Sequence, residues 1–251
     1  MELSKAREFI AEAKLPTPPP TPPGTFKKKG GATEIDARAV VNGPQVVTFD
    51  EGISPPTRRA VLDATLFSAL AANAVSSRRG SPEWIAKYRE TLVPLGWSPA
   101  GDTRQTTFEN KRKGQVHEAV IEFLEALALP APALVVVRAA LMALKKVGDD
   151  QPWITVFEQQ TAAQKLTGFN IATVAGKDTA LRTQLSQFTL KGSAQLTQVL
   201  FLKFQKDSVS MDASTENYDI NVGRLIELQP DLEKRLLAFA SQMIAEVPLA
   251  G

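Results

Sequence analysis

The chain contains no cysteine and a single histidine, His117. Disulfide bonds, thiol nucleophiles and cysteine-ligated metal sites are therefore excluded. A catalytic triad would have to use His117, which lies in no nucleophile motif such as G-x-S-x-G. We expect His117 to lie at the surface or boundary of a helix, and we predict no catalytic residues, no metal ion and no cofactor.

Strong charge of one sign is also missing, because the formal net charge is only +2 at pH 7. Basic residues occur in scattered clusters such as Arg58-Arg59 and Lys111 to Lys113. Nucleic-acid-binding modules gather such residues on one face and interleave aromatic side chains for stacking. We therefore expect no nucleic-acid partner.

Long apolar runs are absent as well. The nearest candidate, Ala133 to Leu144, is interrupted by Arg138 and falls short of the roughly 18 residues of a membrane-spanning helix. The first residues carry Glu2, Lys5 and Arg7 where a signal peptide needs an apolar stretch. The compartment stays open: the chain is cytoplasmic, or it is exported without a cleaved signal peptide.

Proline, by contrast, is concentrated in one place, residues 16–23, which read PTPPPTPP. Such a run joins neither a helix nor a sheet and favours an extended polyproline-II conformation of roughly 3 Å per residue. A Lys/Gly-rich stretch follows it to residue 31. We therefore divide the chain into an arm (1–15), a linker (16–31) and a single globular domain (32–251).

The arm has the pattern of a short amphipathic helix. Its apolar stripe consists of Leu3, Ala6, Phe9, Ile10 and Ala13. An isolated helix of this length is marginal in water, so the stripe needs a surface on which to rest. That surface belongs to the chain's own core, to a neighbouring subunit or to another protein.

Within the domain, residues 35–49 alternate around Asn42-Gly43 and predict a β-hairpin. Four helices follow. The first begins after Ser54 and ends at Gly80, the second begins after Ser81 and ends before Pro94, and the last two form an antiparallel hairpin over residues 116–147.

The C-terminal hundred residues change to a period of two. Strands are predicted over 169–173 and 181–190, with a β-bulge near Ser186 or Gln187 where the alternation shifts phase. A central strand is expected over 199–204, flanking strands at 209–211 and 218–222, and a terminal helix from Pro230.

These patterns predict an α+β fold. In it a layer of about four helices packs on a mainly antiparallel sheet or meander, with a C-terminal helix and a projecting N-terminal helical arm. The function that follows most directly is that of a non-enzymatic interaction or assembly protein. Its arm docks on a protein partner or on another copy of itself through the five stripe residues. A homo-oligomer is expected from self-docking.

Two alternatives belong to other classes. The helix after residue 131 is more apolar than a two-layer domain requires, so an exported membrane-active effector or toxin would use the hairpin 116–147. Its membrane-contacting residues would be Leu134, Val136, Val137 and Leu141. A membrane partner is expected only under this alternative.

The other alternative is a carboxylate-dependent hydrolase, which needs only two acidic residues in a cleft. Sugar sites favour exposed aromatic residues. Of the three tryptophans, Trp84 and Trp153 each begin an apolar pattern typical of the core, whereas Trp97 lies in a loop-like context and is the better exposed candidate.

Overall fold

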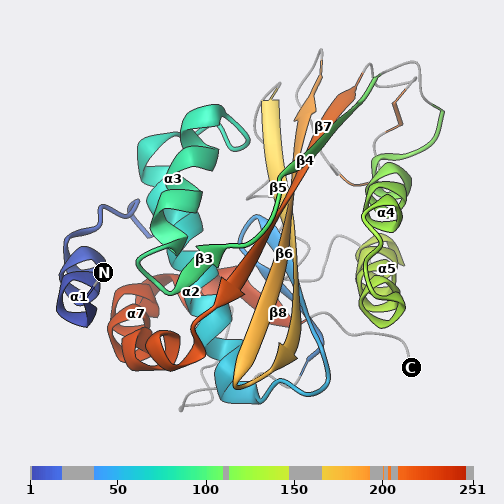
Figure 1. Ribbon diagram of the computed structural model, residues 1–251. Helices are drawn as coiled ribbons and strands as arrows, with labels where there is room; N and C mark the ends of the chain where they lie inside the picture. Colours follow the sequence, from blue (N-terminus) through green and yellow to red (C-terminus); the bar gives the residue numbers. More distant parts are fainter. Residues whose placement is uncertain are drawn as a thin grey trace.

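A computed structural model describes residues 2–18, 37–109, 113–146, 166–192, 200, 203–204 and 209–246. It has three layers, with a sheet between two groups of helices (Figure 1). Predictions for Trp153, for most of the linker and for most of the strand expected at 199–204 lie outside the described residues.

The described residues form six helices. They are α1 (Leu3–Glu12), α2 (Pro55–Val75), α3 (Pro82–Leu92), α4 (Val116–Ala126), α5 (Ala131–Lys146) and α7 (Val222–Met243). Helices α1, α2, α3 and α7 lie on one side of the sheet and the α4–α5 hairpin on the other (Figure 1).

The sheet is mostly antiparallel and open. Its strands are β1 (Ala39–Asn42), β2 (Gln45–Phe49), β3 (Trp97–Pro99), β4 (Arg104–Phe108), β5 (Leu166–Lys177), β6 (Ala180–Lys191), β7 (Ser210–Ile220) and β8 (Ile244–Glu246). Seven of them lie side by side in the order β3-β7-β6-β5-β2-β1-β8, and β4 also pairs with β7. Among the strands that the structure describes, only the β2–β5 pair is parallel.

Local sequence explains several boundaries. Ser81 accepts a hydrogen bond from the Trp84 N–H at 3.3 Å and caps α3 as predicted. The β1–β2 hairpin turns at Gly43-Pro44, one residue later than predicted, because Asn42 still pairs with Gln45; Gly43 has a φ of +61°. The terminal helix begins earlier than predicted, because Asn221 accepts a hydrogen bond from the Arg224 N–H at 3.0 Å and caps it, so Pro230 lies inside α7.

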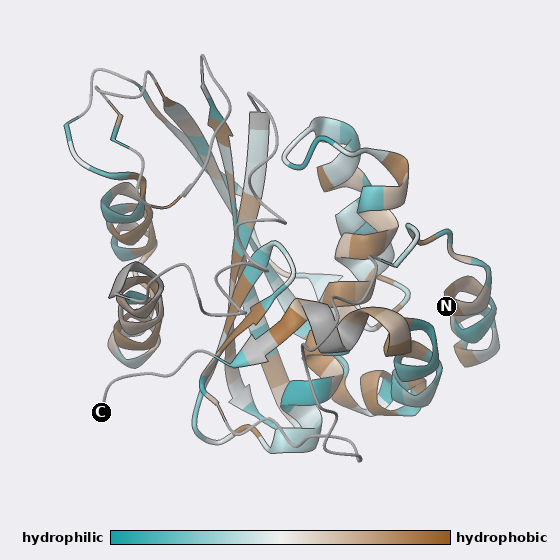
Figure 2. Ribbon diagram, turned by 180° about the vertical axis from the view of Figure 1, so that it is seen from behind, coloured by the Kyte–Doolittle hydropathy of each residue, from teal (hydrophilic) through white to brown (hydrophobic). Residues whose placement is uncertain are grey.

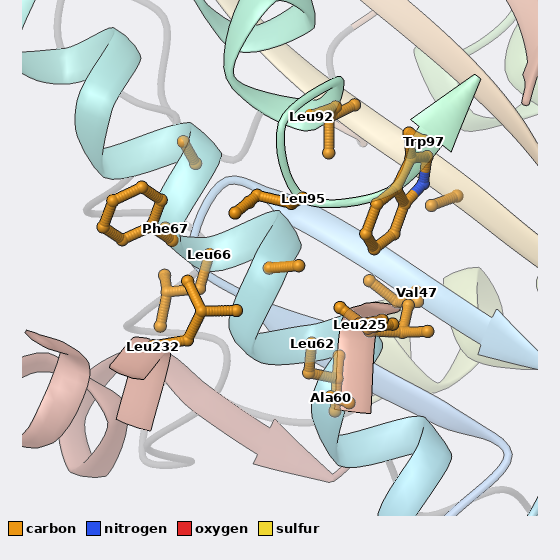
Figure 3. Packing of buried hydrophobic residues seen from close by; sticks show 14 of the residues in the cluster. Val47, Ala60, Leu62, Leu66, Phe67, Leu92, Leu95, Trp97, Leu225 and Leu232 are labelled. Atoms are coloured by element: carbon orange, nitrogen blue, oxygen red, sulfur yellow. The ribbon is translucent and has the colours of Figure 1, made fainter. Parts of the chain in front are cut away.

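Each face of the sheet supports its own apolar core. One core lies under α2, α3 and α7 and includes Leu62, Leu66, Trp97 and Leu225, which point toward one another in Figure 3. The other lies under α4 and α5. Figure 2 shows hydrophobic residues along the strands between the two helical layers, as a sheet covered on both faces requires.

Because helices cover both faces of the sheet, two predictions about strands were wrong: the β-bulge in β6 and the division of β7 into two strands. Leu185 belongs to the first core and Phe188 to the second, so the phase shift in β6 is a change of covered face. The β5–β6 register is continuous, with Asn170 opposite Gln187, and there is no bulge. The flanking segments 209–211 and 218–222 belong largely to the single strand β7. In the predicted strand 199–204, the described Lys203 makes only an isolated bridge, to Gln115.

Candidate docking site

Helix α1 lies against α7 of its own chain (Figure 1). Ala6 and Ile10 have exposed fractions of 0% and 1% and belong to the first core. Leu3, Phe9 and Ala13 are half-buried and pack against the same core. The structure thus brings all five predicted stripe residues to one surface. Of the three surfaces that the sequence left open, it places the stripe on the chain's own core.

Polar contacts surround this apolar strip. The Arg7 guanidinium forms an ion pair with Asp231, Nε to Oδ2 3.3 Å, and also donates to the Glu227 carbonyl at 3.5 Å. At the other end of α1, Arg235 donates to the carbonyl oxygen of Ala13. The side chains of Arg7 and Asp231 stay 53% and 41% exposed, so their ion pair contributes at most about 1 kcal/mol to the docking of α1. Its main effect is to fix the orientation of α1 on α7.

Helix α3 completes the docking surface. The Lys87 ammonium lies 5.9 Å from the centroid of the Phe9 ring, within the range of a cation–π contact. The docking surface therefore consists of Glu227, Asp231 and Arg235 on α7 with Lys87 on α3, above the apolar residues that bury Ala6 and Ile10.

The sequence of α7 produces this surface by its helical period. Leu225, Leu228, Leu232 and Leu236 are buried and face the core. Glu227, Asp231 and Arg235 follow one another at intervals of four residues, so they line an adjacent face of the helix. One side of α7 therefore holds the core while the next side holds α1.

Helix α1 has little intrinsic stability. It has ten residues, its N-cap Glu2 makes no side-chain capping hydrogen bond, its first turn has no acidic residue and its last turn has no basic residue. Helix α1 itself therefore supplies none of the usual compensations of its dipole, and the Arg235 guanidinium at its C-terminal end comes from α7. Because so short a helix is marginal alone, its helical state depends on the surface against which it docks.

The residues predicted to contact a membrane lie in the second core. Val136, Val137 and Leu141 are buried and Leu134 is half-buried, all packed with the face of the sheet that α4 and α5 cover. Among the described helices, only this hairpin lies on its side of the sheet (Figure 2). Within the part of the chain that the structure describes, no helix is long and apolar enough to span a membrane.

Two further residues lie elsewhere than the sequence indicated. Trp97 is 1% exposed and packs between Val47 and Leu95 in the first core (Figure 3), so it is not an exposed sugar-stacking residue. His117 is buried on α4 rather than at the surface or boundary. Trp84 is buried as predicted. The sequence did not predict the burial of Trp97, because the flanking Gly96 and Pro99 are typical of an exposed turn.

A cavity of about 280 Å³ lies between α3, the β3–β4 connection and β7. Its lining includes Glu216, which forms an ion pair with Arg89 at 2.8 Å and accepts a hydrogen bond from the Tyr218 hydroxyl at 2.6 Å. Burial, followed by the nearby Glu216 carboxylate, raises the pKa of Tyr218 above its usual range. Glu90 also lines the cavity and forms an ion pair with Lys87.

This cavity gathers two carboxylates, the minimum for the hydrolase alternative. Both oxygens of Glu216 already accept hydrogen bonds or ion-pair contacts from Arg89, Thr103 and Tyr218. Among the described residues, no group of three or more metal-ligating side chains occurs.

Comparisons with known proteins leave the chain without a family. No family model and no curated protein matches it. Among solved structures, a delta-endotoxin is similar at 9% identity and a TM-score of 0.34, covering 79% of this chain and 88% of that one. The Evf virulence factor is similar at 10% identity and a TM-score of 0.33, covering 98% of this chain and 92% of that one. Similarity at this level says nothing about what this chain does.

Proposed function

We propose that this chain is a non-enzymatic interaction protein that acts through α1 and through the docking surface on α7 and α3. The observation that carries the proposal is that α1 is a separate helix, joined to the domain through a proline-rich linker and held there by the burial of Ala6 and Ile10 and by a few polar contacts. A module attached in this way is able to leave its surface and dock elsewhere while the domain stays folded.

The energetics favour release of α1 over unfolding of the domain. Full burial of one Ile side chain contributes about 1.5–3 kcal/mol, and Ala6 adds less. The half-buried Leu3, Phe9 and Ala13 add to this burial, and the entropy of ordering the helix opposes it. The net stability of the docked arm is therefore a few kcal/mol at most, below that of the domain as a whole.

The test uses a fluorescent peptide of residues 1–15 and two full-length variants. Ala6→Glu places a carboxylate in the buried strip, whereas Ala11→Glu makes the same change at an exposed position of the same helix. We expect Ala6→Glu to dislodge the chain's own arm, because an unpaired buried charge is costly. The vacated surface should then bind the peptide saturably in fluorescence anisotropy.

The Ala11→Glu chain is the matched control, since its own arm stays docked and competes. It should bind the peptide at least about tenfold more weakly, because the tethered arm is present at an effective concentration near the millimolar range. A peptide that itself carries Ala6→Glu should not bind either chain. Equal peptide binding to both chains, or none to either, would contradict the proposal.

A membrane-active role is the second candidate, and one observation favours it. Val135 on α5 is 66% exposed, beside the buried Val136 and Val137, so apolar side chains occupy both sides of this helix. Dye release from anionic liposomes is the measurement, with the exposed Val135→Asp as the variant because it leaves the core intact. Release by the wild type that the variant loses would support this role, and absence of release at any pH would remove it.

A further inference from the structure

We propose that the cavity between α3, the β3–β4 connection and β7 binds a neutral, hydroxyl-rich ring, either a free sugar or the terminal sugar of a longer glycan. The lining of this cavity includes no residue of the docking surface, so the inference adds a second ligand to the proposed function. The volume of about 280 Å³ lies just below the roughly 300–1,000 Å³ of pockets for larger ligands. The cavity therefore admits one ring rather than an extended chain.

The cavity exists because one edge of the sheet is interrupted. Strands β3 and β4 both pair with β7, β3 opposite residues 218–220 and β4 opposite residues 211–215. Between these two stretches, Glu216 and Asn217 face the connection 100–103, whose Ala100 N–H donates to the Asn217 carbonyl at 2.8 Å. This connection turns at Gly101, which lines the cavity and where an added methyl group would meet no atom within 4 Å. The space beside the turn is therefore open.

The polar groups of the cavity keep hydrogen-bonding capacity beyond the contacts they already make. Among the described residues, Oε2 of Glu216 accepts a hydrogen bond only from the Tyr218 hydroxyl, although a carboxylate oxygen is able to accept two. The hydroxyls of Tyr218 and Thr103 both donate to Glu216, so their oxygens stay able to accept. Three acceptors thus lie close together in one cavity.

Arg89 supplies a donor beside these acceptors. Its Nη2 lies 2.8 Å from Oε1 of Glu216 and donates to Oε1 of Gln187 at 2.9 Å, whereas its Nε is buried with no partner among the described residues. The Arg89 side chain is 33% exposed, so the guanidinium is able to turn toward a ligand. A hydroxyl group donates and accepts at once, and therefore suits a cavity that offers both kinds of partner.

The sheet beneath Arg89 carries two more unpaired donors. Gln187 and Asn170 lie opposite each other in β6 and β5 and are 5% and 3% exposed. In the described structure neither side-chain nitrogen has a hydrogen-bond partner. Native structures leave few buried polar groups unpaired. Three such donors on neighbouring side chains therefore favour a polar ligand at this place.

The charges of the cavity balance, which favours a neutral ligand. Arg89 neutralises Glu216, and Glu90 forms an ion pair with Lys87 at 3.3 Å. An anion would meet two carboxylates, and a cation would meet the Arg89 guanidinium. The wall also includes Val93, which is 52% exposed at the end of α3. A sugar ring has hydroxyls at its edge and apolar C–H groups on its faces, so it matches both the polar groups and Val93.

The test is an NMR titration of the isotope-labelled full-length chain with the methyl glycosides of glucose, galactose, mannose and N-acetylglucosamine. We expect at least one of them to shift the amide signals of Gly101 and Thr103 and the Nε–H signal of Arg89 saturably, with a dissociation constant on the order of 1–10 mM. Cyclohexanol, a ring with a single hydroxyl, should not bind. The trisaccharide of the bound sugar distinguishes the two sources, because tighter binding indicates the end of a glycan and equal binding a free sugar.

Two threonines provide a matched pair of variants. Thr103→Val removes a hydroxyl from the lining of the cavity, whereas Thr107→Val removes a hydroxyl that donates to Asp212 at 2.9 Å on the same edge of the sheet, outside the cavity. Thr103→Val should weaken binding about three- to tenfold. Thr107→Val should leave it unchanged.

Two arginines provide a second pair. Arg89→Lys keeps the charge beside Glu216 but loses the Nε–H, and should weaken binding about tenfold or more. Arg182 also forms an ion pair with a carboxylate of β7, at 3.0 Å, but does not line the cavity. Arg182→Lys is therefore the control and should bind as the wild type does.

Three results would overturn the site. The first is that none of the four glycosides binds at concentrations up to about 100 mM. The second is that cyclohexanol binds as well as the glycosides, and the third is that the cavity variants weaken binding no more than their controls. The peptide experiment on the docking surface uses none of the cavity residues, so it stands or fails independently of this result.

Discussion

Arg59 donates from its Nε to both carboxylate oxygens of Asp63, one turn further along α2, at 2.9 Å to each. Asp63 is fully buried, and the burial raises the pKa of its carboxyl from 3.8 to about 6, against the opposing effect of the Arg59 charge. The Glu233 carboxylate on α7 raises the pKa further. A buried carboxyl with this pKa makes the stability of the domain depend on pH.

The direction of this pH dependence follows from the number of protons that the folded and unfolded chains bind. Between pH 3.8 and about 6 the folded chain keeps a proton on Asp63 that the unfolded chain has lost, so the free energy of unfolding falls as the pH rises through this window. Two pKa units correspond to about 3 kcal/mol.

We therefore expect Asp63→Asn, which cannot ionise, to gain stability relative to the wild type by up to about 3 kcal/mol between pH 4 and pH 7. Urea unfolding of both chains across this range gives the difference. Other titrating groups cancel in the comparison, so a difference that does not change with pH would show that Asp63 titrates normally.

A second prediction concerns the close approach of the α2–α3 loop to the sheet. A methyl group at Gly80 would lie 2.7 Å from Oγ1 of Thr189, and Gly80 has a φ of +81°. At Gly101 the φ is +88°, but no atom lies within 4 Å of an added methyl group.

Both alanine substitutions thus carry backbone strain, and only Gly80→Ala adds a clash. We expect Gly101→Ala to cost about 1 kcal/mol of unfolding free energy and Gly80→Ala about 2–4 kcal/mol. Thermal and urea unfolding measure both. Equal costs would mean that the loop moves away freely.

A third prediction concerns buried tyrosine hydroxyls. The hydroxyl of Tyr88 donates to Oε1 of Gln45 at 2.9 Å, and both residues are fully buried. Tyr88→Phe leaves that oxygen without its donor and should cost about 1–3 kcal/mol. Tyr218→Phe removes a donor from Glu216, which keeps Arg89 and Thr103, and should cost less. The reverse ranking in urea unfolding would refute this account.

The helices were predictable because their ends are encoded locally. Ser81-Pro82 fixes a helix start, and Gly43 with its positive φ fixes a turn, each through the conformations of a few residues. Strand pairing was less predictable, since alternation indicates one buried face and this sheet has two. Leu185 and Phe188 belong to opposite cores, so the apolar alternation of β6 changes phase as it would at a β-bulge, although the strand is regular.

Of the two sides of the candidate docking site, the sequence predicted the stripe of α1 but not the surface on α7. The stripe of α1 was visible from its spacing, because Ala6 and Ile10 lie four residues apart in a polar segment. The docking surface on α7 was not, since Glu227, Asp231 and Arg235 resemble any solvated helix face. Their regular interval of four residues was the only signal. The surface on which a helix docks depends on tertiary packing, and the helical periodicity of a sequence does not predict that packing.

The central claim is that α1 leaves α7 while the domain stays folded, and native-state hydrogen exchange of the wild-type chain tests it most directly. Amides of α1, such as that of Ile10, should exchange through an opening a few kcal/mol above the folded state, with little denaturant dependence. Amides of α2 should exchange only through global unfolding. If α1 and α2 instead share one opening free energy and one denaturant dependence, the arm is an inseparable part of the core and the account is wrong.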